Sequence, residues 1–250
     1  MTQFVFMYHD VIQDQLSESG FNTSGANYYK TTSAIFESHI LKISSLISIG
    51  KIQHDSVVLT FDDGGRSFYD VIAPILEKYG FIGHFYIATQ YIGSPAFLSS
   101  KEIKELSDRG HIIGSHSVSH PSNIQRLSKD DIIKEWTDSI NILQAIVGRD
   151  ITEVSIPNGY FDVNDVELLR ELGIKTIYTS NLSDKVYLNG INIIGRYSIT
   201  KKTTQVEVQK MLTSRFYVTT IICKQYALKI FKKKLGNNYI MLKKLIRKWL

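Results

Sequence analysis

The 250-residue sequence contains a single cysteine, Cys223, which excludes an intramolecular disulfide. A lone cysteine gives no sign of an oxidising compartment, and we expect it to fill a small buried apolar position. No uninterrupted apolar run is long enough to cross a bilayer. The opening residues MTQFVFMYHD lack the positively charged leader of a signal peptide. These absences favour a cytoplasmic protein, although a chain trimmed of its leader would look the same.

Acidic residues are absent from the last part of the chain. Residues 1–207 hold 18 Lys and Arg against 24 Asp and Glu, whereas residues 208–250 hold 11 basic residues and no acidic one. The net charge of +5 therefore comes from the tail. No basic stripe interleaved with aromatics runs through the body, which argues against nucleic-acid binding. We expect residues 1–207 to form one domain and residues 208–250 to form a basic amphipathic helical tail.

The last residues of the tail have an amphipathic pattern. From Leu242 onward apolar residues recur at helical spacing, and Lys and Arg occupy the other face. A helix in residues 237–250 could contact an anionic membrane surface, which would place the protein at the inner face of the membrane. It could equally pack on the domain with its basic face in solvent. The sequence leaves both alternatives open and does not indicate an oligomeric state.

Short β-branched and aromatic runs alternate with amphipathic stretches of helical length. The strand-like runs are residues 4–8, 57–61, 83–88, 111–115, 153–157, 175–179 and 192–196. The helix-like stretches are residues 33–49, 67–79, 99–109, 128–147, 164–172 and 203–216. This alternation predicts an α/β fold with a parallel sheet covered by helices. An open sheet and a closed barrel both fit, and either would place the chemistry at the carboxyl ends of the strands.

Polar motifs follow two of the predicted strands. Asp62 and Asp63 come directly after the run at 57–61, and His116 and His120 follow the run at 111–115. An acidic pair can merely cap a helix, and histidine pairs four residues apart also occur by chance. If the histidine segment turns helically, both imidazoles lie on one face and can share an ion. One carboxylate with two imidazoles would form a three-ligand metal site with open positions for water and substrate.

These motifs resemble those of the polysaccharide deacetylases of the NodB-homology type. TFDDG at 60–64 is similar to the first motif of the family and HSVSH at 116–120 to the second, and the match spans about residues 4–200. MYHDV at 7–11 resembles the branch that de-N-acetylates biofilm exopolysaccharides such as poly-N-acetylglucosamine. The resemblance implies a distorted (β/α) barrel of about seven units with parallel strands. It also implies a metal-dependent hydrolase that removes N-acetyl groups from an amino sugar in a polysaccharide or its precursor.

The resemblance implies a role for each residue of the two motifs. By resemblance, Asp62 corresponds to the general base of the family. Asp63, His116 and His120 correspond to the ligands of a divalent ion. The chemistry agrees, because an acetamide is a poor electrophile and its hydrolysis needs an ion that polarises the carbonyl and activates water. Two nitrogens and one oxygen make Zn²⁺ the default, while Co²⁺ or Ni²⁺ would suit the same ligands.

The third motif departs from the commonest family pattern. Family members often carry Arg and an aromatic residue there, but this chain reads SIPNGY at 155–160. By resemblance the backbone N–H of Asn158, the residue after the proline, serves as the oxyanion donor. Arg196, at the end of the run at 192–196, could supply the missing charge beside the base. A surface or structural ion pair explains Arg196 equally well.

The general acid is the remaining role. The resemblance implies that most of the family uses a histidine late in the chain to protonate the departing amine. In this chain no histidine follows His120. In the branch that MYHDV resembles, this histidine comes from the first strand, which implies His9; without the resemblance, His9 would be interpreted as a strand cap. The altered third motif keeps a second function open, a catalytically inactive barrel that binds glycan or organises a biosynthetic complex.

Overall fold

The structure is a computed structural model that describes residues 3–235. The chain divides into two compact units, Met1–Leu212 and Thr213–Leu250. The predicted domain boundary after Glu207 falls inside a helix of the first unit, α6 (Gln205–Thr213), and stays a prediction. The amphipathic pattern at 237–250 lies outside the described residues.

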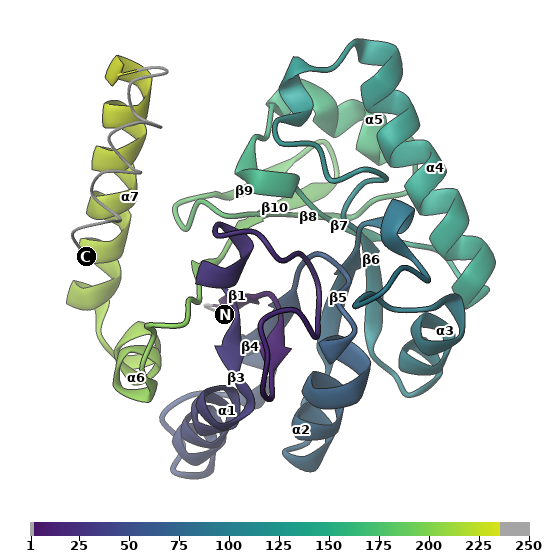
Figure 1. The fold of residues 1–250 in the computed structure, drawn as a ribbon. Helices are drawn as coiled ribbons and strands as arrows, with labels where there is room; N and C mark the ends of the chain where they lie inside the picture. The colour runs from purple at the N-terminus through teal and green to yellow at the C-terminus, as the bar shows by residue number, and fades with distance from the viewer. Residues whose placement is uncertain (1–2, 236–250) are drawn as a thin grey trace. The chain divides into compact units, whose positions relative to one another are not determined.

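The first unit is built around a curled, mostly parallel sheet with helices on its outside (Figure 1). Along the sheet the strands are β11 (Tyr197–Ser198), β1 (Phe4–Tyr8), β4 (Val57–Phe61), β5 (Gly83–Ile87), β6 (Ile112–Ser115), β7 (Glu153–Ser155), β8 (Thr176–Thr179), β10 (Ile191–Gly195) and the antiparallel β9 (Lys185–Leu188). A separate two-stranded sheet joins β2 (Val11–Ile12) to β3 (Thr31–Thr32). Each of the seven predicted runs forms a strand, which confirms the α/β fold class and the distorted barrel.

One continuous stretch of chain connects the two sides of the curled sheet. Strand β10 pairs with β8, the chain then passes through Arg196, and β11 pairs with β1 so that Tyr197 lies opposite Phe6. The same segment therefore joins β10, next to one edge of the sheet, to β11 at the other edge. Arg196 is the residue between these two strands.

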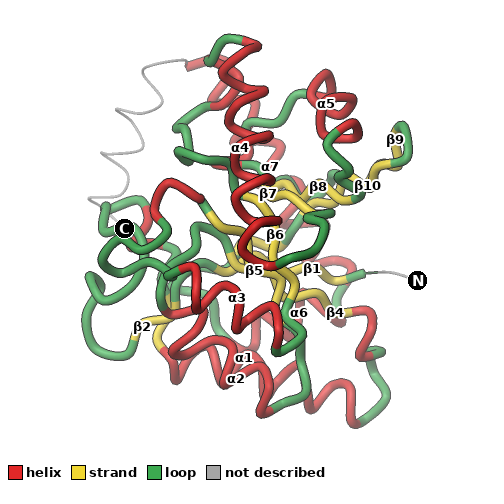
Figure 2. Tube along the Cα trace, turned by 90° about the vertical axis from the view of Figure 1, so that its right-hand side faces the viewer, coloured by secondary structure: helices red, strands yellow, loops and turns green. Residues whose placement is uncertain are grey.

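Helices surround the strands, as the tube view shows (Figure 2). They are α1 (Ser33–Ser48), α2 (Ala73–Lys78), α3 (Ser100–Asp108), α4 (Lys129–Val147), α5 (Val166–Glu171) and α6. Two of these helices begin with side-chain caps of the ordinary kind. Ser99 and Glu102 form a reciprocal capping box on α3, and the Ser128 side chain accepts the N–H of Asp131 at the start of α4.

Two predicted helices differ from expectation. The stretch at 67–79 begins as a π-helical turn, Phe68–Ile72, before α2. The stretch at 203–216 is broken, because α6 ends at Thr213 and a second helix, α7 (Arg215–Leu235), begins beyond it. The break coincides with Ser214, whose Oγ accepts the N–H of Tyr217 at 3.2 Å and so caps the new helix.

The period of two along the strands decides which side chains enter the barrel. Val5, Val58, Tyr86 and Tyr178 form one buried cluster, with Ile194 packed against it. Thr60 and Asp62 lie two and four positions beyond Val58, so the same alternation turns them inward as well. Toward the carboxyl ends of the strands, this cluster is therefore followed by polar side chains.

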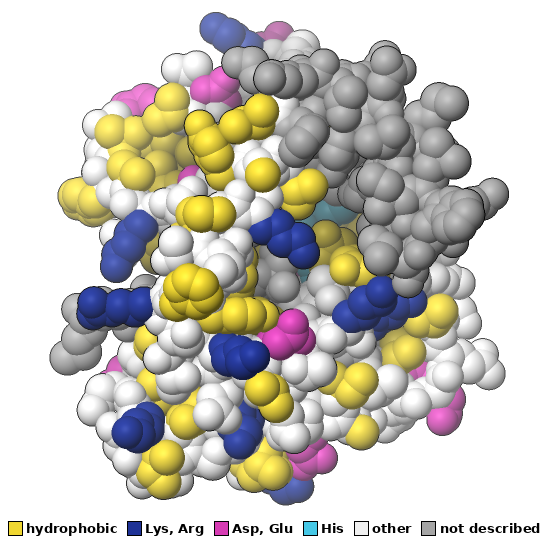
Figure 3. All heavy atoms as spheres, turned by 90° about the vertical axis from the view of Figure 1, so that its left-hand side faces the viewer, with side chains coloured by type: hydrophobic (Ala, Val, Ile, Leu, Met, Phe, Trp, Pro, Cys, Tyr) yellow, Lys and Arg dark blue, Asp and Glu magenta, His cyan; other side chains and the backbone are white. Residues whose placement is uncertain are grey.

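The described part of the second unit is helix α7. It carries no acidic residue, and it leaves Phe216 (81%) and Tyr226 (66%) largely exposed. Cys223 also lies on α7 and is exposed, so the expectation of a buried cysteine is wrong. On the molecular face drawn in Figure 3, hydrophobic side chains lie interspersed with Lys and Arg. Among residues 3–235, no helix combines the length and apolarity needed to cross a membrane.

Candidate active site

The predicted site residues all follow strands at one edge of the sheet. They are His9 after β1, Asp62 and Asp63 after β4, His116 and His120 after β6, Asn158 after β7 and Arg196 after β10. The carboxyl ends of parallel strands in a barrel surround a common mouth. The fold therefore brings residues from both halves of the chain to one place.

Arg196 and Asp62 form a buried two-point ion pair. Nη1 lies 2.8 Å from Oδ1 and Nη2 lies 2.8 Å from Oδ2, and Arg196 is fully buried. The other guanidinium N–H groups donate to Thr60 Oγ1 at 2.9 Å, to Ser155 Oγ at 2.8 Å and to the Thr179 carbonyl at 3.1 Å. Each donor of this buried cation thus has an acceptor. The structure places Arg196 directly on Asp62.

These contacts set the orientation and the charge of Asp62. Ser155 donates to Asp62 Oδ2 at 3.0 Å while it accepts from Arg196. Burial alone would raise the pKa of Asp62, but the charges of Arg196 and His116 outweigh burial and hold the pKa below its usual range. Asp62 is therefore ionised at neutral pH and can accept a proton.

Replacing Arg196 by Met should destabilise the fold, because Asp62 would stay buried without its cation. We expect the free energy of unfolding at pH 7 to fall by about 3–5 kcal/mol. The lowered pKa of Asp62 means that the wild-type pair stabilises the fold above the pKa of the unfolded chain, and that this contribution is lost as pH falls through the folded pKa. The difference in free energy of unfolding between Arg196→Met and the wild type should therefore decrease as pH falls. Urea unfolding across a pH series measures this difference.

Arg170 provides a matched control for this prediction. It pairs with Glu167 on the surface, where both side chains are about half exposed. Exposed pairs contribute little to stability, so Arg170→Met should unfold like the wild type at every pH. Equal unfolding curves for Arg196→Met and the wild type would contradict the stabilising role of the buried pair.

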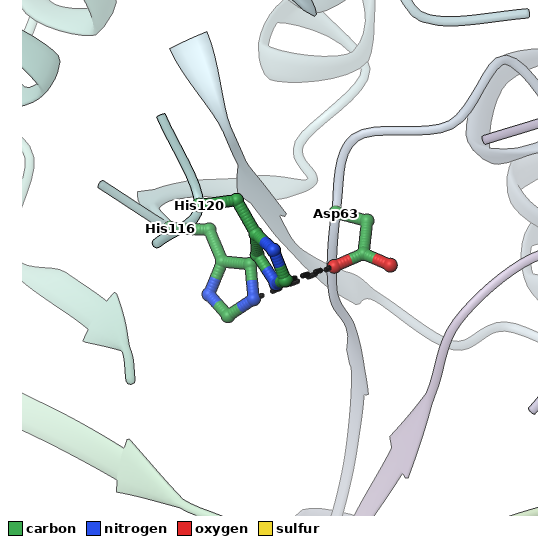
Figure 4. A group of neighbouring side chains, drawn as sticks. All are labelled: Asp63, His116 and His120. Carbon is green, nitrogen blue, oxygen red and sulfur yellow. Dashed lines mark ion pairs between the residues drawn. The ribbon is translucent and has the colours of Figure 1, made fainter. Parts of the chain in front are cut away.

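Asp63, His116 and His120 form a compact group of potential metal ligands. The Nε2 atoms of His116 and His120 lie 3.5 Å and 3.3 Å from Asp63 Oδ1, and one ligand atom from each residue lies within 4.8 Å of the other two. Figure 4 shows both imidazoles pointing toward the carboxylate. Asp63 Oδ1 is buried and accepts no hydrogen bond from the described residues. A buried carboxylate oxygen without a donor is an expected feature of a cation site.

The histidine tautomers fit the same interpretation. His116 Nδ1 lies 2.8 Å from the Ser155 carbonyl, to which only a protonated nitrogen can donate, so the lone pair of the neutral ring is on Nε2, facing Asp63. Burial lowers the pKa of His120 to about 4, which leaves this ring neutral at physiological pH. Burial would also raise the pKa of Asp63, but the neighbouring histidines outweigh it and keep the carboxylate ionised. The donor set therefore suits a divalent cation.

The segment that joins the two histidines is not helical. Ser117 (φ 64°) and His120 (φ 53°) both adopt the left-handed conformation. The resulting bend still places the two rings together, with centroids 5.0 Å apart. The helical turn considered from the sequence is therefore wrong, although the two rings do meet.

His9 lies beside this group. Its ring stacks on Tyr29 with centroids 4.8 Å apart, and its charge acts on the pKa values of Asp62 and Asp63. Its Nδ1 is buried and has no hydrogen-bond partner among residues 3–235. The structure thus brings His9 to the mouth of the barrel, where its role as an acid stays a prediction.

Asn158 lies in the turn Pro157–Gly159 after β7. It is exposed, has φ 56°, and its side chain donates to the carbonyl of Pro121 at 3.2 Å. Pro121 directly follows His120, so this bond holds the turn against the histidine loop. Asn158 is therefore at the rim of the site, and its role as an oxyanion donor stays a prediction.

The sequence analysis did not identify two residues of the site. Ser155 touches both Asp62 and Arg196; it is the first residue of the SIPNGY motif, but the sequence analysis assigned it no role. Phe21 packs against His120 with ring centroids 5.2 Å apart. It comes from the loop between β2 and β3, which has no periodic pattern. Only the folded chain shows that this loop reaches the site.

Comparison with known proteins agrees with this geometry. The family model described as "Polysaccharide deacetylase" matches residues 50–177. Peptidoglycan-N-acetylmuramic acid deacetylase PdaA of Bacillus subtilis is 30% identical over 135 residues, 53% of this chain and 49% of that protein. Poly-beta-1,6-N-acetyl-D-glucosamine N-deacetylase of Staphylococcus aureus is 26% identical over 149 residues, 54% of this chain and 51% of that protein. The chain spans about half the length of these curated relatives.

Solved structures share the fold over more of the chain. The Streptococcus pyogenes deacetylase PplD, solved in complex with acetate, has a TM-score of 0.69 and 22% identity, covering 85% of this chain and 98% of that one. IcaB from Ammonifex degensii has a TM-score of 0.65 and 18% identity, covering 85% and 97%. At such identities the likeness concerns the fold alone. The family match, in contrast, spans both sequence motifs of the site, and the chain belongs to the polysaccharide deacetylase family.

Proposed function

We propose that this protein is a metal-dependent deacetylase that removes N-acetyl groups from an amino sugar in a polysaccharide or its precursor. The observation that carries the proposal is the ionised Asp62 beside the Asp63, His116 and His120 group at one mouth of the barrel. The names of the two curated relatives describe deacetylases of N-acetylated glycans. Acetate, present with PplD, is the acid product of any deacetylation.

Asp63, His116 and His120 would hold the metal ion. The orphaned Asp63 oxygen and the Nε2 lone pair of His116 support this assignment. One oxygen and two nitrogens suit Zn²⁺ best, and Co²⁺ or Ni²⁺ would also fit. When bound, the ion would act as a Lewis acid toward the amide carbonyl and lower the pKa of water.

Other residues of the chain would divide the remaining tasks. Asp62, oriented by Arg196, would accept the proton of the attacking water. The backbone N–H of Asn158 would donate to the oxyanion that forms on the carbonyl oxygen. His9 would give a proton to the departing amine. This division uses each predicted residue once and needs no second ion.

A cluster of aromatic rings beside His120 supports a sugar substrate. Phe21 contacts the His120 ring, and Tyr91 and Phe97 pack against Phe21 with centroids 4.8 Å and 5.1 Å away. The three aromatic side chains are partly exposed. Aromatic faces pack well against the apolar faces of ligands, which for a pyranose are its C–H faces. The cluster would hold a sugar ring with its N-acetyl arm directed toward the metal ligands.

Turnover of an N-acetylglucosamine oligomer tests the proposal directly. The full chain would be stripped of metal, reloaded with Zn²⁺ or Co²⁺, and assayed for released acetate and for free amine. Equal amounts of both products are expected. An O-acetylated sugar as competing substrate would show whether an ester replaces the amide.

The altered third motif is the reason to keep a second function in view. A catalytically inactive barrel would bind the oligomer yet release no acetate with either Zn²⁺ or Co²⁺. The contacts of Arg196 favour the enzyme, because they give Asp62 a cation in spite of that alteration.

His9→Gln should lower turnover by about 10²-fold and leave the metal content and stability nearly unchanged. An amine is a poor leaving group unless it is protonated, and glutamine cannot supply the proton. The alkaline limb of the pH–rate profile should disappear with the histidine. Steady-state kinetics across a pH series measures both effects. If the limb persists at near wild-type turnover, another group protonates the amine and His9 is structural.

The basic tail would place the enzyme at a membrane that carries lipid-linked glycans. Residues 237–250 lie outside the described residues, so this proposal rests on the sequence pattern. Removing them should sharply reduce co-sedimentation with vesicles that contain anionic lipid, while neutral vesicles serve as the control. Unchanged binding would refute a membrane role for residues 237–250.

A further inference from the structure

The loop that carries both metal-ligating histidines is bent in an unfavourable way. Ser117 and His120 have positive φ angles, which side-chain-bearing residues rarely adopt. Such a conformation persists only where neighbouring groups hold it. The structure shows which groups do so.

Glu135, on the outer helix α4, binds the centre of this loop. Its Oε2 accepts the backbone N–H groups of Val118 and Ser119, both at 2.9 Å. Its Oε1 accepts the hydroxyl of Ser119 at 2.6 Å. One half-buried carboxylate thus receives three hydrogen bonds from the residues between His116 and His120. Bonds to an ionised acceptor are the stronger kind.

The same face of α4 also fixes the beginning of the loop. Ser139, four residues after Glu135, hydrogen bonds to Ser115 at 2.7 Å between the two Oγ atoms. Ser115 Oγ in turn accepts the N–H of Ser117 at 3.1 Å. Positions four apart lie one above the other on a helix. Helix α4 therefore holds the start and the centre of the loop from one side.

We propose that Glu135 is a positioning residue of the metal site, which keeps the His116–His120 loop in its ligating conformation before an ion arrives. This inference rests on the metal site of the proposed function. Glu135 itself bonds to the loop backbone and to Ser119, and does not belong to the ligand group. Its loss would let the loop leave the left-handed conformation, and ion binding would then have to restore it. Loss of a group that orients metal ligands usually lowers the metal affinity 10- to 100-fold.

Glu135 could also raise the affinity for a cation simply through its negative charge. A substitution at Asp138 distinguishes this explanation from the positioning role. Glu135 and Asp138 lie one turn apart on α4 and line the same surface hollow with Val118. Asp138 is exposed and, among the described residues, forms no hydrogen bond with the histidine loop, so Asp138→Asn removes a nearby charge and keeps the loop's hydrogen bonds. If long-range attraction were the cause, Glu135→Gln and Asp138→Asn would lower the affinity for Zn²⁺ equally.

Zn²⁺ titration of the metal-free full chain against a chromophoric chelator tests the proposal. Glu135→Gln should raise the dissociation constant for Zn²⁺ about 10- to 100-fold, and Asp138→Asn should leave it within about twofold. Ser119→Ala removes only one of the three bonds and should give a smaller rise of the same sign. Thermal unfolding of each metal-free variant shows that the fold is retained.

The outcomes separate this inference from the proposed function. If the wild type binds no Zn²⁺, the metal site is refuted and so is the positioning role of Glu135. A wild type that binds Zn²⁺ while Glu135→Gln and Ser119→Ala bind it equally well overturns the positioning role and leaves the proposed function intact. Equal weakening by Glu135→Gln and Asp138→Asn, with no effect of Ser119→Ala, also overturns it, because charge alone then accounts for the loss. If Glu135→Gln does not fold, unchanged affinity in Ser119→Ala decides against the inference.

Discussion

Asp62→Asn should lower turnover of an N-acetylglucosamine oligomer by about 10²- to 10⁴-fold while the protein keeps its metal ion. An asparagine cannot accept the proton of water, although it fills the same space beside Arg196. The three metal ligands are not touched by the change, so the ion should stay. Acetate release and metal analysis on one preparation measure both quantities. A rate like that of the wild type would mean that another group serves as the base.

The buried Arg196 complicates this experiment, because Asp62→Asn leaves its charge without a counter-ion. Loss of activity could then reflect a distorted site. The double variant Asp62→Asn with Arg196→Met removes both charges and should recover part of the stability lost in the single variant. If chemistry is the cause, the double variant stays as inactive as the single one. Recovery of activity in the double variant would instead assign the loss to the stranded arginine.

His116→Ala should lose both the bound ion and all measurable turnover while the fold survives. The variant keeps only Asp63 and His120, and two ligands hold a catalytic ion weakly. His54→Ala is the matched control, because His54 is about half exposed and bonds to the Gly80 carbonyl on the surface. Metal analysis after dialysis compares the two variants. Full occupancy in His116→Ala would show that the ion binds elsewhere.

The pH dependence of metal binding supplies a second test of the same site. Burial would lower the pKa of His116, but Asp62 and Asp63 outweigh burial and raise it above its usual value. A protonated imidazole cannot bind an ion, so the Zn²⁺ affinity of the wild type should fall about tenfold per pH unit below the pKa of His116. His120, with its pKa lowered to about 4, should add to this loss only in more acidic solution. An affinity independent of pH would contradict His116 as a ligand.

The sequence determined the elements of the fold because their signals are local. Runs such as VVLTF at 57–61 combine β-branched residues with a following acidic pair, and the structure ends β4 at Phe61 directly before Asp62. The spacing of His116 and His120 also indicated a shared site, although the helical turn on which that argument depended is not formed. Local signals fail where a segment has no periodic pattern. The position of the loop that carries Phe21 was therefore not expected. The break at Ser214 was missed for another reason, because the stretch at 203–216 has a helical pattern on both sides of it.

The tertiary structure alone decided how the Asp62 carboxylate is held. Arg196 and Asp62 are 134 positions apart, and nothing in either local sequence states that they touch. They meet because one segment pairs with β8 as β10 and then with β1 as β11, which buries Arg196 inside the curled sheet. Glu135 likewise occupies an unremarkable position of an outer helix until the fold sets it against the histidine loop. Periodicity reports which face of an element is buried, whereas contacts between distant segments depend on how the whole sheet curls and closes.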